Sequence, residues 1–160
     1  MNTELLHLAQ SKLAKSRVRL DLADFDKKLL EKVPAGAVFV CNQLLPGLDE
    51  WVMLSFLAEH FDSVKILHPY PIAPPKSLQP HLLRPSRKRL EDRLLRLNFA
   101  KRLSRRIRKG DVVALTLDFS DNPLSHLGKN LVRTQILRQI RKSGQPVIPV
   151  HLQAERMPGG

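Results

Sequence analysis

The stretch VFVCNQLLPGLDEWVML, residues 38–54, places a strand, a turn and the start of a helix in one run. Its first four residues are β-branched or otherwise apolar, which is typical of a short buried strand. Pro46 and Gly47 then predict a tight turn, and Asp49 favours the first turn of a helix that continues to residue 61. The stretch therefore predicts one complete βα unit.

The same alternation of strand and helix continues along the chain. A helical region is predicted before residue 34, with residues 22–33 either continuing the first helix or forming a second one. Residues 69–85 are rich in proline and predict an extended loop that is neither helix nor central strand. Further strands and helices are predicted, in order, at 64–67, 86–109, 111–117, 129–143 and 147–152.

This pattern predicts an α/β fold with a mostly parallel sheet flanked by helices on both faces. The predicted regions are an N-terminal helical region at 1–34, an α/β domain at 35–153 and a C-terminal tail at 154–160. Ligands bind such sheets beyond the carboxyl ends of the strands. The candidate loops for a functional site are therefore 42–48, 68–85 and 118–128.

The formal net charge is +12, and most of it lies in one segment. Between Arg84 and Lys109 stand twelve Lys or Arg residues against two acids, which leaves +10 in this segment alone. Such a concentration indicates an anionic partner: nucleic acid, phospholipid headgroups, the phosphates of CoA or an acidic protein. A solvated helix face with redundant charge is the alternative interpretation.

Several classes of site have no support in the sequence. Neither GxGxxG nor GxxxxGK[ST] is present, so nothing indicates a glycine-rich nucleotide cradle. There is no GxSxG motif, and the six histidines show no metal-ligand spacing, so no metal site is predicted. The single cysteine, Cys41, excludes an internal disulfide and is interpreted as a small core residue rather than a nucleophile. No apolar run reaches the ~18–20 residues that a bilayer span needs.

Residues 38–54 resemble the first motif of the glycerolipid acyltransferases, in particular the lysophospholipid acyltransferase-like proteins of bacteria. In that family a strand ends in Asn-His, a glycine-containing turn follows and an Asp opens the next helix. The His is the general base on the acceptor hydroxyl, and the Asp orients it. The segments 63–86, 108–122 and 143–152 resemble later parts of the family pattern, in the same order. The resemblance covers about residues 36–153 and implies an acyltransferase-like fold.

Transferred to this chain, the resemblance places Gln43 at the base position and Asp49 at the orienting position. Gln43 cannot act as a base near neutral pH, because an amide does not titrate there. The third motif lacks its Pro-Glu-Gly core, and Asp118 is the carboxylate left in that place. Loss of a general base typically costs ~10²–10⁴ in rate, so weak or absent catalysis is expected. A base supplied by His68 or His126 remains an alternative.

The resemblance also implies substrates. The expected substrate-binding residues are Asn42, Gly47, His68, Arg87, Arg93 and Arg96. The arginines would bind phosphate groups, for which a guanidinium is well shaped. The acyl donor would be acyl-CoA or acyl carrier protein, with no further cofactor. The acceptor would be a lysophospholipid or another phosphate-bearing or amphipathic molecule.

The expected function is thus a lysophospholipid or glycerolipid acyltransferase-like domain of phospholipid metabolism. The expected location is the cytoplasm, with peripheral attachment at the inner membrane left open. The alternative is a pseudoenzyme, a basic module that docks on an anionic membrane, an acidic protein or nucleic acid. Nucleic acid is the less favoured partner, because aromatic residues are only 5% of the chain and no nucleic-acid-binding module is legible.

Overall fold

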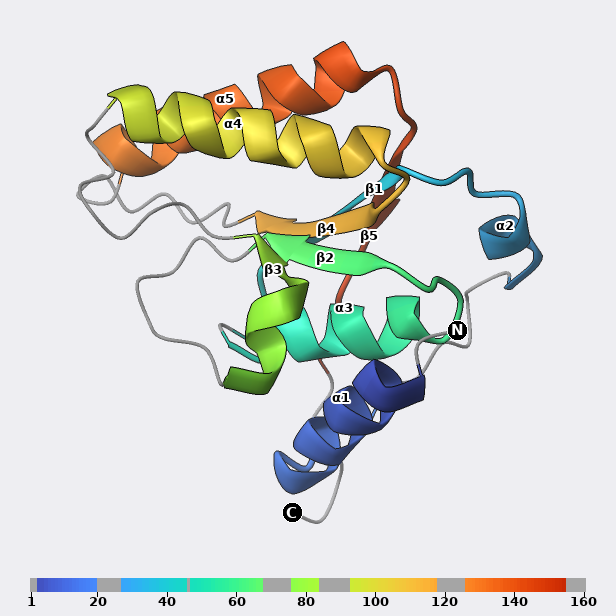
Figure 1. Ribbon diagram of the computed structural model, residues 1–160. Coiled ribbons are helices and arrows are strands. Elements are labelled where there is room, and N and C mark those ends of the chain that lie inside the picture. The colour runs from blue at the N-terminus through green and yellow to red at the C-terminus, as the bar shows by residue number, and fades with distance from the viewer. Residues whose placement is uncertain are drawn as a thin grey trace.

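The computed structural model covers all 160 residues and describes the segments 3–19, 27–45, 47–67, 76–83, 93–117 and 126–154. In the helix 93–108 side chains are described from Ala100 onward, and in the helix 126–143 at Thr134 and from Ile136 onward. Figure 1 shows a central sheet with helices on either side of it.

The sheet has five strands, and all of its pairings are parallel. The strands are β1 (Val38–Asn42), β2 (Val64–Leu67), β3 (Leu82–Leu83), β4 (Val112–Leu117) and β5 (Val147–Val150). They lie in the order β3-β2-β4-β1-β5, so β1 sits between β4 and β5. The β1–β4 register ends with Asn42 opposite Leu117, which brings the carboxyl ends of these two strands together.

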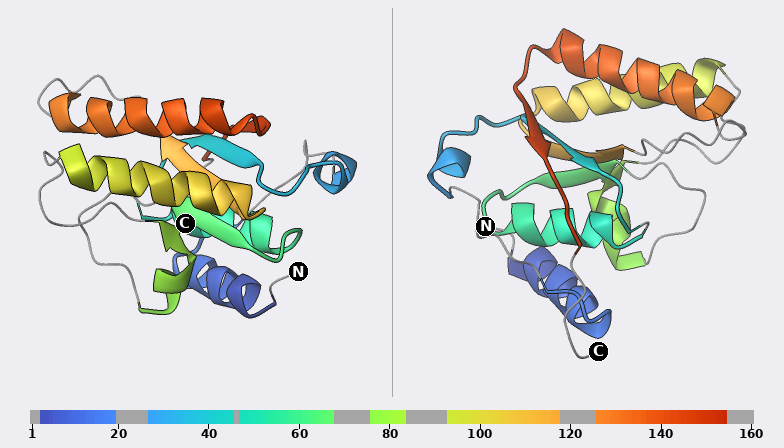
Figure 2. Two further views of the ribbon diagram at one scale, coloured as in Figure 1. Left: turned by 45° about the horizontal axis from the view of Figure 1, so that its top comes forward. Right: turned by 180° about the vertical axis from the view of Figure 1, so that it is seen from behind.

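Helices cover both faces of this sheet. α3 (Asp49–Ala58) lies against one face, and α1 (Thr3–Lys15) packs on α3 from outside. α4 (Arg93–Arg108) and α5 (His126–Ser143) lie side by side over the other face (Figures 1 and 2). A short helix, α2 (Lys27–Glu31), lies between α1 and β1 in the chain.

Two hydrophobic cores form because successive strand residues point to opposite faces of the sheet. In β1, Phe39 and Cys41 belong to the core on the α3 side, whereas Val38 belongs to the core under α4 and α5. The ring of Phe39 meets that of Phe56 edge-on, with centroids 6.5 Å apart. The buried residues that α4 and α5 contribute recur at helical spacing: Ala100, Leu103, Ile107, Ile136 and Ile140.

The predicted α/β fold, with a parallel sheet and helices on both faces, is confirmed. The prediction for residues 69–85 is wrong in one respect, because residues 76–81 form the 3₁₀ helix η1 (Lys76–His81), followed by the edge strand β3. Leu78 of η1 is buried in the core beside α3, and the Lys65 ammonium donates a hydrogen bond to the Pro80 carbonyl at 2.8 Å. These contacts hold a helical turn that proline content alone argues against.

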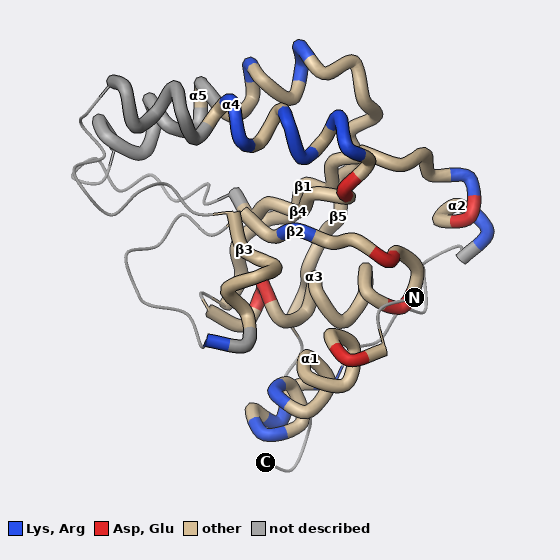
Figure 3. The backbone as a smooth tube through the Cα atoms, viewed as in Figure 1, with Lys and Arg blue, Asp and Glu red and all other residues tan. Residues whose placement is uncertain are grey.

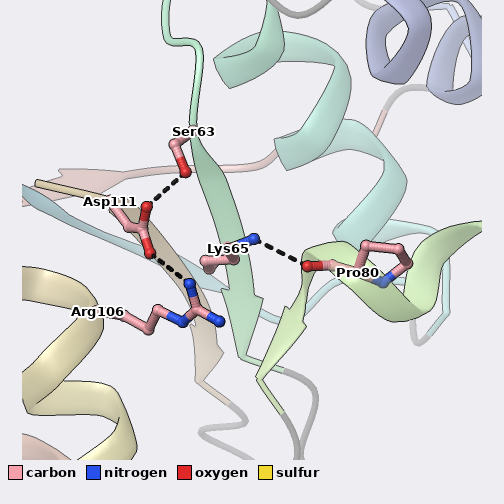
Figure 4. Close-up of polar contacts among 5 residues, drawn as sticks. All are labelled: Ser63, Lys65, Pro80, Arg106 and Asp111. Atoms are coloured by element: carbon pink, nitrogen blue, oxygen red, sulfur yellow. Dashed lines mark hydrogen bonds and ion pairs between the residues drawn. The ribbon is translucent and has the colours of Figure 1, made fainter. Parts of the chain in front are cut away.

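A polar cluster joins the sheet to α4 at the amino ends of β2 and β4 (Figure 4). The Ser63 hydroxyl donates a hydrogen bond to the Asp111 carboxylate at 2.5 Å, and Arg106 forms an ion pair with the same carboxylate at 3.5 Å. Burial lowers the pKa of Lys65 beside them, and the negative charge of Asp111 opposes that shift. The cluster lies at the opposite end of the strands from the loops where a ligand is expected.

The connections after β1 and β4 leave the sheet on opposite faces. β1 is followed by α3 on one face, whereas β4 is followed by α5 on the other. Adjacent parallel strands whose connections diverge in this way leave a crevice at their carboxyl ends, and such a position is where open α/β sheets bind ligands. The fold therefore places its candidate site at Asn42 and Leu117 and in the turn that follows Asn42.

Candidate functional site at the carboxyl end of β1

The turn after β1 is held in place by the side chain of Asp49. Its carboxylate accepts hydrogen bonds from the backbone N–H of Leu44 at 2.9 Å and of Leu45 at 3.0 Å. Only 2% of Asp49 is exposed, so these bonds satisfy a charge that α3 carries into the protein interior. The family resemblance implies that Asp49 orients a catalytic base. In the structure it fixes the shape of the turn.

Gln43 lies between the end of β1 and this turn and is half-buried. It therefore lies at the carboxyl ends of β1 and β4, in the position that the resemblance assigns to the base. Its amide can donate and accept hydrogen bonds, but it cannot take up a proton in the physiological range. Gln43 and Asp49 thus belong to one short turn, and they can position a polar group without activating it.

Asn42 pairs with the backbone that follows β5. Its Nδ2 donates to the Leu152 carbonyl at 2.9 Å, and its Oδ1 accepts the Leu152 N–H at 2.6 Å. The amide thereby continues the β1–β5 pairing, whose last backbone register is Cys41 with Val150. The resemblance assigns Asn42 to substrate binding. The structure shows that both ends of its amide bond the protein backbone.

Beneath the turn, polar side chains are buried on the α3 side of the sheet. Glu50 is 3% exposed and Thr116 is 6% exposed, and the thiol of Cys41 donates to the Leu115 carbonyl at 3.6 Å. The Thr116 hydroxyl has no hydrogen-bond partner among the described residues. Neither Glu50 nor Thr116 is among the site residues predicted from the sequence. The burial of Glu50 could have been predicted from its place in the first turn of a helix that is apolar on every side, because such a helix is buried all round.

Burial, together with the neighbouring negative charges of Asp49 and Glu50, raises the pKa of the Cys41 thiol to about 12. A thiol with such a pKa stays protonated at neutral pH, and the thiolate is the reactive form of cysteine. Only 1% of Cys41 is exposed. The residue is therefore a core residue at this edge of the sheet and does not act as a nucleophile.

The other predicted site residues lie in the turn after β1, at the beginning of α4 and α5, or outside the described residues. Gly47 lies in the turn with a positive φ of 86°, and its Cα faces open space. Arg93 and Arg96 lie in the first turns of α4, at residues whose side chains the structure leaves undescribed. His68, Arg87 and Asp118 lie outside the described residues. His126 is the first residue of α5.

Positive charge gathers on the helical layer formed by α4 and α5 (Figure 3). The exposed basic residues described there are Lys101, Arg102, Arg105, Arg106, Arg108, Lys109, Arg138, Arg141 and Lys142. Neither helix contains an acidic residue. The sequence predicts basic helices at 86–109 and 129–143, but it does not predict that they lie side by side on one face of the sheet.

Within the described segments, no helix combines the length and the apolar character that crossing a bilayer requires. Comparisons with protein-family models, with curated proteins and with solved structures yield no significant match.

Proposed function

We propose that this chain is an acyltransferase-like domain that binds an acyl donor and a phosphate-bearing or amphipathic acceptor, and that it is a weak catalyst or none. The observation that carries the proposal is the turn 43–49. It lies at the diverging carboxyl ends of β1 and β4, where α/β folds bind ligands, and it presents Gln43 where the family resemblance places a base.

The described residues on either side of Pro46 support binding because hydrogen bonds hold them in place. Three hydrogen-bond contacts join Asp49 to the backbone of Leu44 and Leu45, and the pair between Asn42 and Leu152 fixes the strand end before the turn. A preorganised loop loses little conformational freedom when a ligand binds. The side chains of Leu44 and Leu45 are exposed on this turn and offer apolar contacts to an acyl chain or an amphipathic acceptor.

Weak catalysis follows from the chemistry of Gln43. Acyl transfer to a hydroxyl requires a group that removes its proton, and the amide of Gln43 cannot do so. The carboxylate of Asp49 offers about four acceptor positions, of which the turn uses three contacts. An imidazole at residue 43 would restore a group that can take up a proton in this turn. Gln43→His introduces an imidazole, whereas Gln43→Asn keeps an amide that cannot take up a proton. The two substitutions therefore form a matched pair.

The test measures acyl transfer from acyl-CoA or acyl carrier protein to lysophosphatidic acid by mass spectrometry. We expect the wild-type protein and Gln43→Asn to remain near background and Gln43→His to gain activity by at least tenfold, a small part of the ~10²–10⁴ range of general base catalysis. Robust wild-type turnover that survives in Gln43→Ala would place the base elsewhere. Absence of acyl-donor and lysophospholipid binding in calorimetry would contradict the proposal as a whole.

A non-catalytic binding module is the second candidate function. The observation that favours it is the exposed positive charge of α4 and α5, two helices that cover the same face of the sheet. Such a role needs no base at residue 43. Calorimetry distinguishes the two candidates, because a pure docking module binds no acyl donor.

A further inference from the structure

The outer surface of α4 and α5 presents cations from two neighbouring helices. We use the term basic face for six of these exposed residues: Lys101, Arg105, Arg108, Arg138, Arg141 and Lys142. Both helices use their other sides to cover the sheet, where Leu103, Ile107 and Ile140 are buried. The basic face is therefore directed away from the protein core. Like charges crowded together in this way repel one another unless an anion neutralises them.

Two internal explanations account for only part of this charge. Cations in the last turn of a helix complement its dipole, but that effect is confined to about one turn, and Lys101 and Arg138 lie further inside their helices. An ion pair with Asp111 engages Arg106, which is not counted in the basic face. The sequences of α4 and α5 contain no carboxylate that could pair with the rest.

The shape of the basic face favours a broad anionic surface over a groove. An α-helix that reads DNA enters the major groove, which is about 12 Å wide and admits one protruding helix. Here α4 and α5 lie side by side, so neither protrudes alone (Figure 2). Stacking on single strands requires aromatic side chains, and none is described on the basic face.

An exposed apolar side chain lies among these cations. Leu137 of α5 is 42% exposed and precedes Arg138, with Arg141 one turn further along the same helix. A leucine surrounded by basic residues can enter the boundary between headgroups and acyl chains while the cations remain at the phosphates. The long stems of Lys and Arg adapt to such an interface.

We propose that the basic face docks the protein on the surface of an anionic phospholipid bilayer, with α4 and α5 lying flat on it. Phospholipid phosphates neutralise the six cations, and Leu137 contacts the acyl boundary. The inference uses no chemistry at Gln43, so it stands independently of the proposed acyl-donor binding.

The expected strength follows from the number of charges. Each Lys or Arg close to an anionic bilayer contributes roughly fivefold to the partition coefficient. Removal of three cations should therefore weaken binding about a hundredfold. Binding should also fade with salt, because the Debye length falls from about 30 Å at 0.01 M to about 3 Å at 1 M ionic strength.

The test is co-sedimentation of the full chain with phosphatidylcholine vesicles that either contain or lack phosphatidylglycerol. The test variant carries Lys101→Gln, Arg105→Gln and Arg108→Gln. The matched control carries Lys12→Gln, Lys15→Gln and Lys76→Gln, which remove the same charge from exposed positions on α1 and η1, on the α3 side of the sheet. Circular dichroism verifies that both variants fold.

We expect binding only to vesicles with phosphatidylglycerol, with the test variant losing about a hundredfold in affinity and the control nearly unchanged. A second variant, Leu137→Gln, should weaken binding by a similar factor at low and high salt, because it removes an apolar contact rather than a charge. Equal losses in test and control variants would show that net charge rather than the basic face attracts the bilayer. No binding at low salt would overturn the proposal.

Nucleic acid is the competing outcome. Binding to double- and single-stranded DNA and RNA is measured by filter retention, at the same phosphate and salt concentrations as in the vesicle assay. Retention of nucleic acid without vesicle binding would assign the basic face to a different partner and would also overturn the proposal. Free glycerol phosphate added in excess should not displace the protein from vesicles, since a single phosphate engages few of the six cations.

Discussion

The side chain of Asn42 and the backbone of Leu152 form a reciprocal pair of hydrogen bonds, 2.9 and 2.6 Å long, across 110 residues of sequence. An amide side chain reproduces the donor and acceptor of a peptide group, so β1 gains one further bonding position toward the segment after β5. The pair closes the carboxyl edge of the sheet on the side of the candidate turn. It therefore gives Asn42 a structural reason to be an amide, independent of any substrate.

We predict that Asn42→Ala lowers the free energy of unfolding by about 1–3 kcal/mol, because two partly buried backbone groups lose their partners. Asn42→Asp should be destabilising as well, since a carboxylate keeps the acceptor for the Leu152 N–H but faces the Leu152 carbonyl without a donor. Urea denaturation measures both effects. Gln43→Ala is the control and should stay within about 0.5 kcal/mol of the wild type.

Asp49 is predicted to stabilise the turn more than it assists any reaction. Asp49→Ala removes the acceptor for the N–H groups of Leu44 and Leu45 and leaves a small cavity, which should cost about 2–4 kcal/mol in urea denaturation. Asp49→Asn keeps the volume and one acceptor oxygen, so its loss should be smaller. Exchange of the Leu44 and Leu45 amide hydrogens should accelerate in both variants. Unchanged stability in Asp49→Ala would contradict the assigned role.

Much of the fold could be predicted from the sequence because its signals are local. The runs 38–41 and 112–115 are continuous and apolar, and 64–67 is interrupted only by Lys65, as is typical of strands buried on both faces. The helix containing Leu103 and Ile107 has an apolar stripe at helical spacing. The 3₁₀ helix at 76–81 could not be predicted in this way. It depends on the burial of Leu78 and on the bond from Lys65 to Pro80, which are tertiary contacts.

The candidate site could be predicted only in outline. The sequence places Gln43 and Asp49 in one turn, because the turn residues between them are local. It does not reveal that Asn42 bonds Leu152, since this contact depends on β5 lying beside β1. Nor does it reveal that α5 shares the basic face with α4. α4 connects β3 to β4, and α5 connects β4 to β5, so both connections run in the same direction across the sheet. Crossovers between parallel strands are right-handed, which places both helices over one face.

Two glycines test backbone strain and steric contact separately. Gly36 and Gly47 have nearly the same positive φ, 82° and 86°. A Cβ at Gly36 would lie 2.6 Å from the Ile107 carbonyl oxygen, whereas nothing lies within 4 Å of a Cβ at Gly47. We predict that Gly47→Ala costs about 1–2 kcal/mol from the left-handed backbone alone. Gly36→Ala should cost more, because β1 and α4 must move apart. Equal losses in denaturation would contradict this assignment.

The Cys41 thiol should be unreactive in the folded protein and should make stability depend on alkaline pH. At pH 8 a pKa of about 12, compared with an ordinary value of 9.0, makes the thiolate about a thousandfold rarer in the folded chain than in the unfolded chain. Iodoacetamide should therefore label Cys41 only at the rate at which the protein unfolds, and urea should restore full labelling. Rapid native labelling would contradict the burial of the thiol.

The sign of the pH effect follows from the same shift. Because the pKa is raised on folding, the unfolded chain loses its thiol proton first as the pH rises above 9.0, and the unfolded state is favoured. The contribution of Cys41 to stability is thus complete below pH 9.0 and declines toward pH 12, by at most about 1.4 kcal/mol per pH unit. Other groups also lose protons at alkaline pH, so the informative quantity is the difference in stability between wild type and Cys41→Ala. That difference should shrink as the pH rises, and a constant difference from pH 8 to 11 would show that the thiol ionises equally in both states.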